Sequence, residues 1–523
     1  MKGFICCLLI SVALLSACAP ISAPLPEADA SPAGAVPLGD ALTNLEPQDV
    51  WRNFYALTQV PRPSGHLEQV RAYLVQFGQD LGLETSVDNA GNVLIRKPAA
   101  PGMEDRKGVI LQAHMDMVPQ KTPERIHDFT TDPIQAYVDG EWVRAVGTTL
   151  GADDGIGVAI AMAVLQSQTL AAGPIEALFT VDEETAMSGA AGLKPGVLQG
   201  ELYINLDAEE EGAFIIGSAG GALAGVTAAY AEVAAPSDMA AYAVSVQGLK
   251  GGHSGVDIHR GRGNAIKLLV RFLSAAGPAH GVRIAAIEGG NAANAIPREA
   301  TALVCLPTSQ ANAFLEAVEQ YQATIQSELA AVEPELSVQA APADPPANVM
   351  DESAQRVLIA ALYATPHGVM RMSDAVPGLV ETSTNLGIVD GRDGRLSLTC
   401  NMRSSVDSAL DDLAAMVSSV WELAGAETAI SGRYPGWAPN AGSPLLALMQ
   451  QVYAEMYGQP PQVSAVHAGL ECGTIVAKYP GMDAISIGPT LHDVHTPDEA
   501  LHIASVQKLV DFLFTTLSRV PAK

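Results

Sequence analysis

Four expected strand ends and one loop before a helix each carry acidic residues or a histidine. Imidazole and carboxylate groups are ligands for divalent cations such as zinc, and an uncoordinated carboxylate beside them can transfer protons. Each place alone is a weak signal, but together they predict a hydrolytic site that holds two metal ions. The five places are His114-Met115-Asp116, Asp153-Asp154, Glu183-Glu184, Asp207 and His495.

The first two places also have ordinary structural explanations. His114 and Asp116 follow an apolar run, and the two-residue period of a strand puts them on one side, where Asp116 can fix the tautomer of a ligating His114. A surface histidine beside an aspartate would show the same pattern. Asp153 and Asp154 stand in a Gly-rich bend before a helix that starts at Ile156. Either aspartate can cap that helix, and a carboxylate at this point can instead bridge two cations.

The remaining places supply further ligands and a base. Glu183 and Glu184 are expected to end a strand and to point to opposite sides, so that one ligates metal while the other accepts a proton from water. Asp207 ends the next strand. His495 precedes Thr496-Pro497-Asp498-Glu499, which has the pattern of a capping box at a helix start. His492 is the rival ligand in this loop.

Counting the ligands gives each metal three protein groups. His114 and Asp207 would hold one ion, Glu184 and His495 the other, and Asp153 would be shared. A bridging water completes four positions on each ion, and open positions of this kind characterise catalytic zinc sites.

The elements that must position these residues follow an α/β pattern. Short apolar runs that stop at polar residues suit strands buried on both faces of a sheet, and ligands gather at the carboxyl ends of such strands. Strands are expected at 84–87, 92–96, 108–113, 174–181, 201–206 and 484–487, and helices at 50–59, 67–81 and 156–166.

The chain is long enough for more than one domain. Strands that end in clustered carboxylates stop near residue 218, and a pattern of helices and strands that end in polar loops returns after 432. This predicts a catalytic domain with a mixed sheet flanked by helices, and an insert that interrupts its sequence. We expect catalytic segments at 43–218 and 433–523, and an inserted α+β domain at 219–432.

The N-terminus has the pattern of a bacterial lipoprotein signal. A basic residue, an apolar stretch and Leu15-Ser16-Ala17-Cys18 predict a signal peptide at 1–17, lipidation at Cys18 and a disordered Ala/Pro-rich tether at 18–42. This predicts a protein anchored in the cell envelope, at the periplasmic face of the outer membrane. The formal charge of -28 disfavours nucleic-acid binding.

The motifs HMD, GADDGIG, DEET, NLD, GGHSG, HAGLECG and VHTPDEA, in this order, resemble those of the aminoacyl-histidine dipeptidases. The resemblance covers nearly all of residues 45–519. It implies a di-zinc catalytic domain with a lid domain and a cis peptide after Asp153. It also implies that Asp153 bridges the metals, that Asp116 is the orienting catalytic acid, that Glu183 is the general base and that Glu184 is a ligand.

The lid and the returning catalytic segment add candidate substrate contacts. His253 stands in a Gly-rich loop and can reach the oxyanion or the substrate carboxylate when the domains close. The wider resemblance suggests that Asn294 and Arg403 help to hold the substrate, although both can equally serve the structure of the lid. His467 and Glu471 are expected to contact the termini of the substrate or its histidine ring.

These observations predict zinc-dependent hydrolysis of small peptides, in particular Xaa-His dipeptides, with Co²⁺ or Mn²⁺ as alternative metals. The alternatives are N-acyl amino acid deacylation, a broader aminopeptidase, or a peptide-binding lipoprotein without turnover. The resemblance also implies a homodimer that pairs through the lid.

Overall fold

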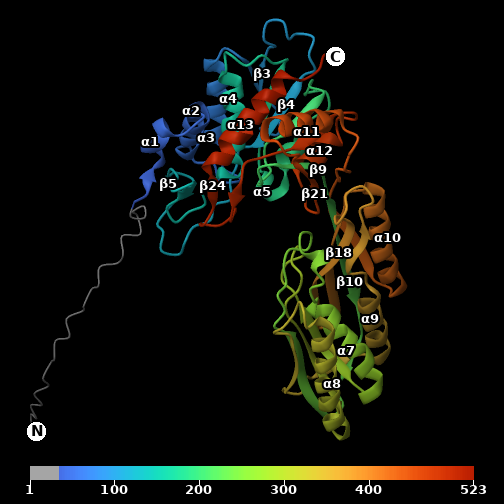
Figure 1. The fold of residues 1–523 in the computed structure, drawn as a ribbon. Helices are drawn as coiled ribbons and strands as arrows, with labels where there is room; N and C mark the ends of the chain where they lie inside the picture. The colour runs from blue at the N-terminus through green and yellow to red at the C-terminus, as the bar shows by residue number, and fades with distance from the viewer. Residues whose placement is uncertain (1–33) are drawn as a thin grey trace, which may run out of the picture.

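The computed structural model describes residues 34–523, which form two lobes (Figure 1). The upper lobe contains both the first part of the described chain and its C-terminal end, and the lower lobe contains the segment between them. Each lobe has its own large cluster of buried apolar side chains. The predicted signal peptide and the lipidated Cys18 lie outside the described residues.

The upper lobe is built on a mixed eight-stranded sheet. Its strand order is β2-β3-β7-β4-β8-β22-β9-β21, and the central strand β4 runs parallel to both β7 and β8. The strands are β2 (Glu84–Val87), β3 (Val93–Lys97), β4 (Val109–His114), β7 (Ile175–Thr180), β8 (Leu202–Asn205), β9 (Ala213–Ser218), β21 (Gln462–Val466) and β22 (Asp483–Ser486).

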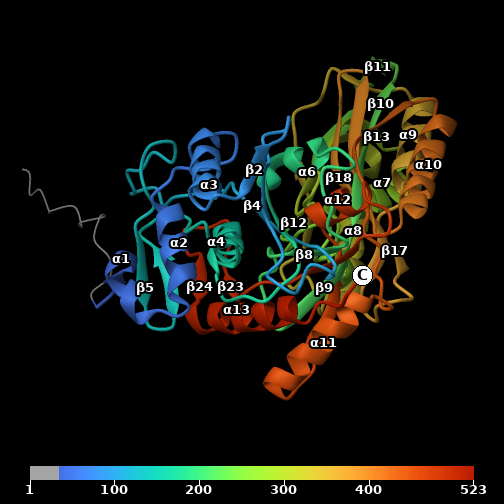
Figure 2. The ribbon, with the colours of Figure 1, turned by 90° about the horizontal axis from the view of Figure 1, so that it is seen from above.

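Helices cover this sheet, and a small second sheet extends the lobe (Figure 2). The helices are α1 (Leu38–Ala41), α2 (Gln48–Thr58), α3 (Glu68–Asp80), α4 (Ala152–Gln166), α5 (Glu183–Ala186), α6 (Ser188–Gly192), α11 (Pro444–Tyr457), α12 (Glu471–Val476) and α13 (Ile503–Ser518). The small sheet contains β1 (Val36–Pro37), β5 (Ala136–Asp139), β6 (Trp142–Ala145), β24 (Ala500–His502) and β23 (Leu491–His492).

The most buried part of this lobe explains why the catalytic side chains sit at one edge of the sheet. Every residue of β4, β7 and β8 is buried, and α4 is apolar and buried along residues 156–165. The first polar residues after each apolar run therefore lie where the strands leave the core. Because β4, β7 and β8 are parallel, these exits lie side by side.

The lower lobe is an antiparallel sheet with helices packed against it. Its order is β15-β12-β14-β13-β18-β19-β10-β20, with β17 paired to β18. The strands are β10 (Gly220–Ala229), β12 (Met239–Gln247), β13 (Arg283–Gly289), β14 (Ala300–Pro307), β15 (Ser337–Pro342), β17 (Gly368–Met372), β18 (Val380–Arg392), β19 (Arg395–Ser404) and β20 (Glu427–Tyr434). The helices are α7 (Ala265–His280), α8 (Ala311–Leu329), α9 (Glu352–Ala364) and α10 (Asp407–Leu423), and β11 (Glu232–Ala234) pairs with β16 (Asn348–Met350).

The limits of the two sheets lie close to the predicted domain limits. The last strand of the upper sheet before the insert ends at Ser218, and β10 of the lower sheet starts at Gly220. β20 continues to Tyr434, two residues past the predicted limit at 432.

Two local predictions in the upper lobe, which contains both predicted catalytic segments and is called the catalytic lobe below, are wrong. The predicted disordered tether reaches residue 42, whereas β1 pairs with β5 and the side chain of Leu38 is fully buried. The capping-box helix predicted at Thr496 is absent from the described structure: β24 follows this loop, and α13 begins only at Ile503. In both places the contacts that decide the structure come from segments distant in the sequence.

Candidate metal centre and cleft

The carboxyl ends of three adjacent strands form the floor of the candidate site. β4 ends at His114, Glu183 and Glu184 follow β7, and Asp207 follows β8. α4 begins at Ala152, so that Asp153 joins this group from the side. The structure thus brings together side chains that are nearly 100 residues apart in the sequence.

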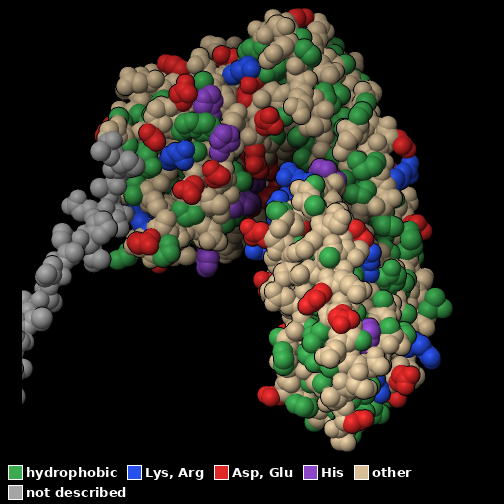
Figure 3. Space-filling model, turned by 60° about the horizontal axis from the view of Figure 1, so that its bottom comes forward, with side chains coloured by type: hydrophobic (Ala, Val, Ile, Leu, Met, Phe, Trp, Pro, Cys, Tyr) green, Lys and Arg blue, Asp and Glu red, His purple; other side chains and the backbone are tan. Residues whose placement is uncertain are grey.

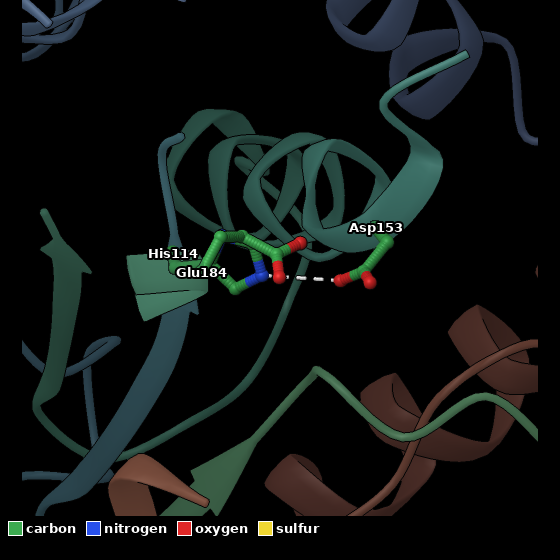
Figure 4. A group of neighbouring side chains, drawn as sticks. All are labelled: His114, Asp153 and Glu184. Carbon is green, nitrogen blue, oxygen red and sulfur yellow. Dashed lines mark hydrogen bonds and ion pairs between the residues drawn. The ribbon is translucent and has the colours of Figure 1, made fainter. Parts of the chain in front are cut away.

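Asp153 lies between two histidines. Its Oδ1 atom is 3.1 Å from Nε2 of His114, and its Oδ2 atom is 3.1 Å from Nε2 of His495. Figure 4 shows His114, Asp153 and Glu184 together at this point, with the Asp153 carboxylate directed toward the imidazole of His114. One carboxylate oxygen for each histidine is the geometry that a bridging ligand requires.

Each histidine also faces a second carboxylate. Oε1 of Glu184 is 2.9 Å from Nε2 of His495, and Oδ1 of Asp207 is 3.5 Å from Nε2 of His114. Two groups of donors therefore share Asp153. The donor atoms of His114, Asp153 and Glu184 also lie within 4.8 Å of one another, as do those of His114, Asp154 and Asp207, so the division of the ligands between two ions stays a prediction. His492, the rival of His495, instead packs against Trp142, with ring centroids 4.7 Å apart and the ring planes inclined by 32°.

The charge of this group favours cation binding. Among the residues that the structure describes, no lysine or arginine forms an ion pair with Asp153, Glu184 or Asp207. Burial raises the pKa of Asp207 to about 8, and hydrogen bonds with Asp153 and Glu184 raise the pKa of His495 to about 11. Buried carboxylates need a cationic partner; the raised pKa values make the two histidines those partners here, and a divalent cation can take over this role from their protons. Nitrogen and oxygen donors of this kind suit zinc, cobalt and manganese.

Asp116 organises the residues around His114. Its Oδ1 lies 3.4 Å from Nδ1 of His114 and accepts the main-chain N–H of Glu183 at 3.1 Å. Its Oδ2 accepts the hydroxyl of Ser64 at 2.7 Å and the main-chain N–H of Glu184 at 3.3 Å. The carboxylate thus fixes the imidazole on one side and the start of α5 on the other.

Glu183 lies next to the metal-type ligands. Burial raises the pKa of its carboxyl group well above its usual range, while the charge of His114 opposes this effect. The predicted extended conformation of Glu183 and Glu184 is wrong, because β7 ends at Thr180 and both residues start α5.

The two aspartates of the GADDG segment have separate tasks. Asp154 accepts the main-chain N–H of Gly157 at 3.2 Å and that of His114 at 3.2 Å. It therefore caps α4 and ties it to β4, while Asp153 faces the histidines. The peptide bond between them is cis, as the resemblance implies.

A second group of predicted residues lies across the cleft. Nε2 of His253 is 3.5 Å from an Nη atom of Arg403, and a second Nη atom of Arg403 donates to the hydroxyl of Tyr434 at 3.2 Å. His467 bonds to the hydroxyl of Ser383 at 2.7 Å. Burial beside the cationic Arg403 lowers the pKa of His467 to about 3, so this ring is neutral.

The cleft between the lobes joins the two groups. Figure 3 shows a hollow with acidic side chains inside it and basic and histidine side chains on the opposing lobe. A side chain at Gly469 would touch both Met187, which follows α5, and Tyr434. Tyr434, which binds Arg403, therefore lies close to the end of α5, the short helix that starts with Glu183 and Glu184.

Two predicted substrate contacts are placed differently. Glu471 is only 1% exposed and accepts from Gln112 at 2.7 Å and Thr180 at 2.5 Å beneath the sheet edge. Residues of β4 and β7 cover one oxygen of its carboxylate, and the predicted contact of Glu471 with the substrate stays a prediction. Asn294 is exposed, and its main-chain oxygen accepts from the N–H of Ser254 at 2.8 Å in the loop of His253.

Sequence reasoning missed three residues that hold this site together. They are Arg62, Ser64 and Glu499, and all three bond to the segments that carry the ligands. The Pro-Ser-Gly turn after Arg62 is a weak signal of a special loop. Glu499 was visible in the sequence only as part of a capping pattern.

The fold and the site define a two-lobed α/β metallohydrolase with its donors at the sheet edge. Residues 110–519 match the family described as Peptidase family M20/M25/M40. The chain belongs to this family, and the predicted fold class and the predicted enzyme class, a hydrolase of peptide bonds, are confirmed.

Individual relatives agree with this assignment. The chain is 44% identical over 482 residues to the cytosol non-specific dipeptidase of Escherichia coli, which covers 92% of this chain and 99% of the relative. It superimposes on the crystal structure of aminoacylhistidine dipeptidase from Vibrio alginolyticus with a TM-score of 0.88 and 44% identity, over 92% of this chain and 98% of that one. The resemblance to aminoacyl-histidine dipeptidases is therefore confirmed. A tripeptidase from Staphylococcus aureus, 16% identical with a TM-score of 0.55, shares the fold.

The predicted location is contradicted by these comparisons. The Escherichia coli relative, matched over 99% of its length, is named for the cytosol, against the predicted anchor at the outer membrane. A basic residue, a short apolar run and a cysteine carry far less information than an alignment of 482 residues. In the part of the chain that the structure describes, no helix has the length and apolar character to cross a membrane.

Proposed function

We propose that this protein hydrolyses dipeptides, with a preference for Xaa-His, at a centre of two divalent metal ions. The observation that carries this proposal is the position of Asp153, whose two oxygens each lie 3.1 Å from a different histidine. His114, Asp207 and Asp153 would hold one ion, and His495, Glu184 and Asp153 the other. The donor set suits zinc, with Co²⁺ or Mn²⁺ as alternatives.

Two cations at this position would polarise the scissile carbonyl and acidify the attacking water. Glu183 is the proposed general base, because it lies beside the ligands and its main chain is held by Asp116. Its carboxylate takes a proton from the water as the carbon–oxygen bond forms. The same proton then passes to the leaving nitrogen as the carbon–nitrogen bond breaks.

The group across the cleft is proposed to bind the substrate. Arg403 suits a bidentate grip on a free carboxylate, and its neighbours His253 and His467 border the same position. Binding the carboxylate at a fixed distance from the scissile bond would limit the length of the peptide. Asn294 is proposed to support this group through the loop of His253.

The test is hydrolysis of β-Ala-His, Gly-His, Ala-Ala and N-acetyl-alanine by the full chain, with added zinc and with chelator. We expect chelator-sensitive cleavage that is fastest for the histidine dipeptides. Glu183→Gln should lower kcat by at least about 10²-fold while two metal ions per chain remain bound. Fastest cleavage of N-acetyl-alanine would instead support a deacylase, and binding of the peptides without any turnover would support a peptide-binding protein.

A further inference from the structure

The loop that carries Asp153 is held by two buried charged residues from distant parts of the chain. Arg62 precedes α3, and Glu499 precedes β24. Each is only 2% exposed. Both make their hydrogen bonds to the main chain of the loop and its neighbour rather than to a surface partner, which is an unusual use of two buried charges.

Glu499 binds four consecutive N–H groups of residues 150–153. Its Oε2 atom accepts from Leu150 at 2.7 Å and from Gly151 at 3.0 Å. Its Oε1 atom accepts from Ala152 at 2.7 Å and from Asp153 at 3.2 Å. Gly151 has no side chain to bind these N–H groups, and Glu499 binds them from 346 or more residues away, while Asp154 caps the regular part of α4.

Arg62 holds the opposite side of the same loop. One Nη atom donates to the carbonyls of Met115 and Asp116 at 3.2 Å and 3.0 Å, and the other donates to the carbonyl of Gly151. The guanidinium group therefore links the end of β4 to the loop before α4. Gly151, which is held by Glu499 through its N–H, is held by Arg62 through its C=O.

The glycines of the GADDG segment fit this arrangement. Gly151 has a φ of +70°, and a side chain there would come within 2.8 Å of Arg62 Nη2 and of Met117 Sδ. A side chain at Gly155 would also collide with Arg62 Nη2. Both glycines are thus required by the path of the Arg62 side chain.

We propose that Arg62 and Glu499 are positioning residues that set the direction of the Asp153 carboxylate and thereby the affinity for the metal pair. The inference rests on the proposed metal centre. Glu499 also stands four residues after His495, so the short strap from His495 to Glu499 couples one ligand directly to the loop of the bridging ligand. Loss of either charge lets this loop move, and a bridging carboxylate tolerates little displacement.

The test measures metal binding by the full chain, independently of turnover. Zinc affinity is determined by competition with a chromophoric chelator, and Co²⁺ absorption spectra report the ligand geometry. Glu499→Gln places an amide N–H₂ against N–H groups, and we expect the dissociation constant of at least one metal to rise about 10- to 100-fold with an altered Co²⁺ spectrum. Arg62→Lys, which keeps the charge but loses the fork, should weaken binding in the same direction.

Glu176→Gln is the matched control. Glu176 is also buried, accepts from the N–H groups of Gln199 and Gly200 at 2.7 Å each, and pairs with Arg96, but it lies on β7 in register with Ile110, four residues before His114 on β4. This variant should lose thermal stability while keeping metal affinity within about twofold of the wild type.

The outcomes separate a positioning role of Arg62 and Glu499 from a general loss of folding. If Glu499→Gln folds and binds both metals within twofold of the wild type, the proposal is overturned. If Glu499→Gln does not fold, the Arg62→Lys variant is compared with Glu176→Gln at an equal loss of Tm. Weaker metal binding by Arg62→Lys supports the positioning role, and equal metal binding overturns it. A wild-type chain that binds two metals but cleaves no dipeptide would refute the proposed function and leave this measurement valid.

Discussion

At the residue scale, Asp116 links the imidazole of His114 to the segment of the proposed base. One carboxylate makes three hydrogen bonds with Ser64, Glu183 and Glu184, and it also faces His114. The Asp116 carboxylate is difficult to replace, because each of these three donors needs an acceptor atom. The pattern His-Met-Asp shows the pair in the sequence, but it does not show the links to α5.

Asp116→Asn should therefore impair the centre although it conserves shape. The amide nitrogen that replaces one oxygen opposes N–H or O–H donors, which leaves one or more buried donors without a partner. We expect kcat/KM for dipeptides to fall about 10- to 100-fold, with weaker zinc binding. Ser64→Ala removes only one bond and should cost about fivefold, corresponding to about 1 kcal/mol. Wild-type activity in Asp116→Asn would contradict this account of the site.

At the scale of elements, the connection between α9 and β17 contains a histidine that is held neutral. Nδ1 of His367 faces two donors, Nδ2 of Asn264 at 3.3 Å and the N–H of Leu386 at 3.4 Å. Burial, together with the nearby charge of Lys267, lowers the pKa of His367 from 6.5 to about 4. Protonation at Nδ1 would break both contacts.

The free energy of unfolding of the lower lobe, the predicted lid, should consequently fall in acid. The pKa of His367 is lower in the folded than in the unfolded state, so its contribution is complete above pH 6.5 and is lost as the pH falls toward 4. The pKa difference sets an upper limit of about 3 kcal/mol, and partial exposure of the ring reduces this to about 2 kcal/mol. Urea unfolding at pH 7.5 and pH 5.0 measures the loss.

The variant His367→Gln isolates this contribution from the titration of other groups. Its free energy of unfolding should change less between the two pH values than that of the wild type, by about 1 to 2 kcal/mol. His259→Gln, at an exposed position of the same lobe, should keep the pH dependence of the wild type. Identical pH dependence in both variants would show that His367 titrates normally.

At the scale of the whole molecule, the two lobes carry different groups of candidate site residues. The catalytic lobe carries the metal-type ligands, and the lid carries His253 and Arg403, whose side chains lie 3.5 Å apart. Figure 3 shows acidic side chains in the hollow and basic and histidine side chains on the opposite lobe. His467, which follows the last strand of the catalytic sheet, reaches Ser383 of the lid at 2.7 Å. Substrate binding is therefore expected to depend on both lobes.

Arg403→Met should separate binding from chemistry. Loss of the guanidinium group removes a partner for the substrate carboxylate but leaves the metal ligands untouched, so KM should rise about tenfold or more with a smaller change in kcat. Arg403→Lys restores the charge without the fork and should recover only part of the loss. Steady-state kinetics with Gly-His, together with metal analysis, would check both variants, and an unchanged KM would remove Arg403 from the substrate site.

The homodimer through the lid stays a prediction. β17 pairs with β18 along one side, and the side chains of Met370 and Met372 are more than one-third exposed on this strand. An exposed apolar edge strand is a favourable surface for pairing with a second copy. Light scattering after size-exclusion chromatography should give twice the mass of one chain, and Met370→Lys should shift it toward the monomer. A wild-type protein with the mass of one chain would contradict the prediction.

Local patterns in the sequence were sufficient to locate the metal-type ligands. The runs at 108–113, 174–181 and 201–206 are mostly apolar, with single polar residues such as Gln112, Glu176 and Asn205 between the apolar ones, and the strands β4, β7 and β8 lie within one residue of these ranges. Burial on both faces forces such a composition, so the point where it stops is visible in the chain itself. His114, Asp207 and the two glutamates after β7 stand at or just after these points.

Only the tertiary structure decided what holds these ligands in place. Glu499 binds loop 150–153 across nearly 350 residues, Arg62 links that loop to β4, and Glu471 is buried although its motif suggested a cleft position. The hydrogen bonds of Glu499 and Arg62 end on main-chain N–H and C=O groups, which every residue type carries apart from the missing N–H of proline. Such bonds leave no pattern at the receiving segment, and for that reason the sequence determined the chemistry of this centre while the fold determined its geometry.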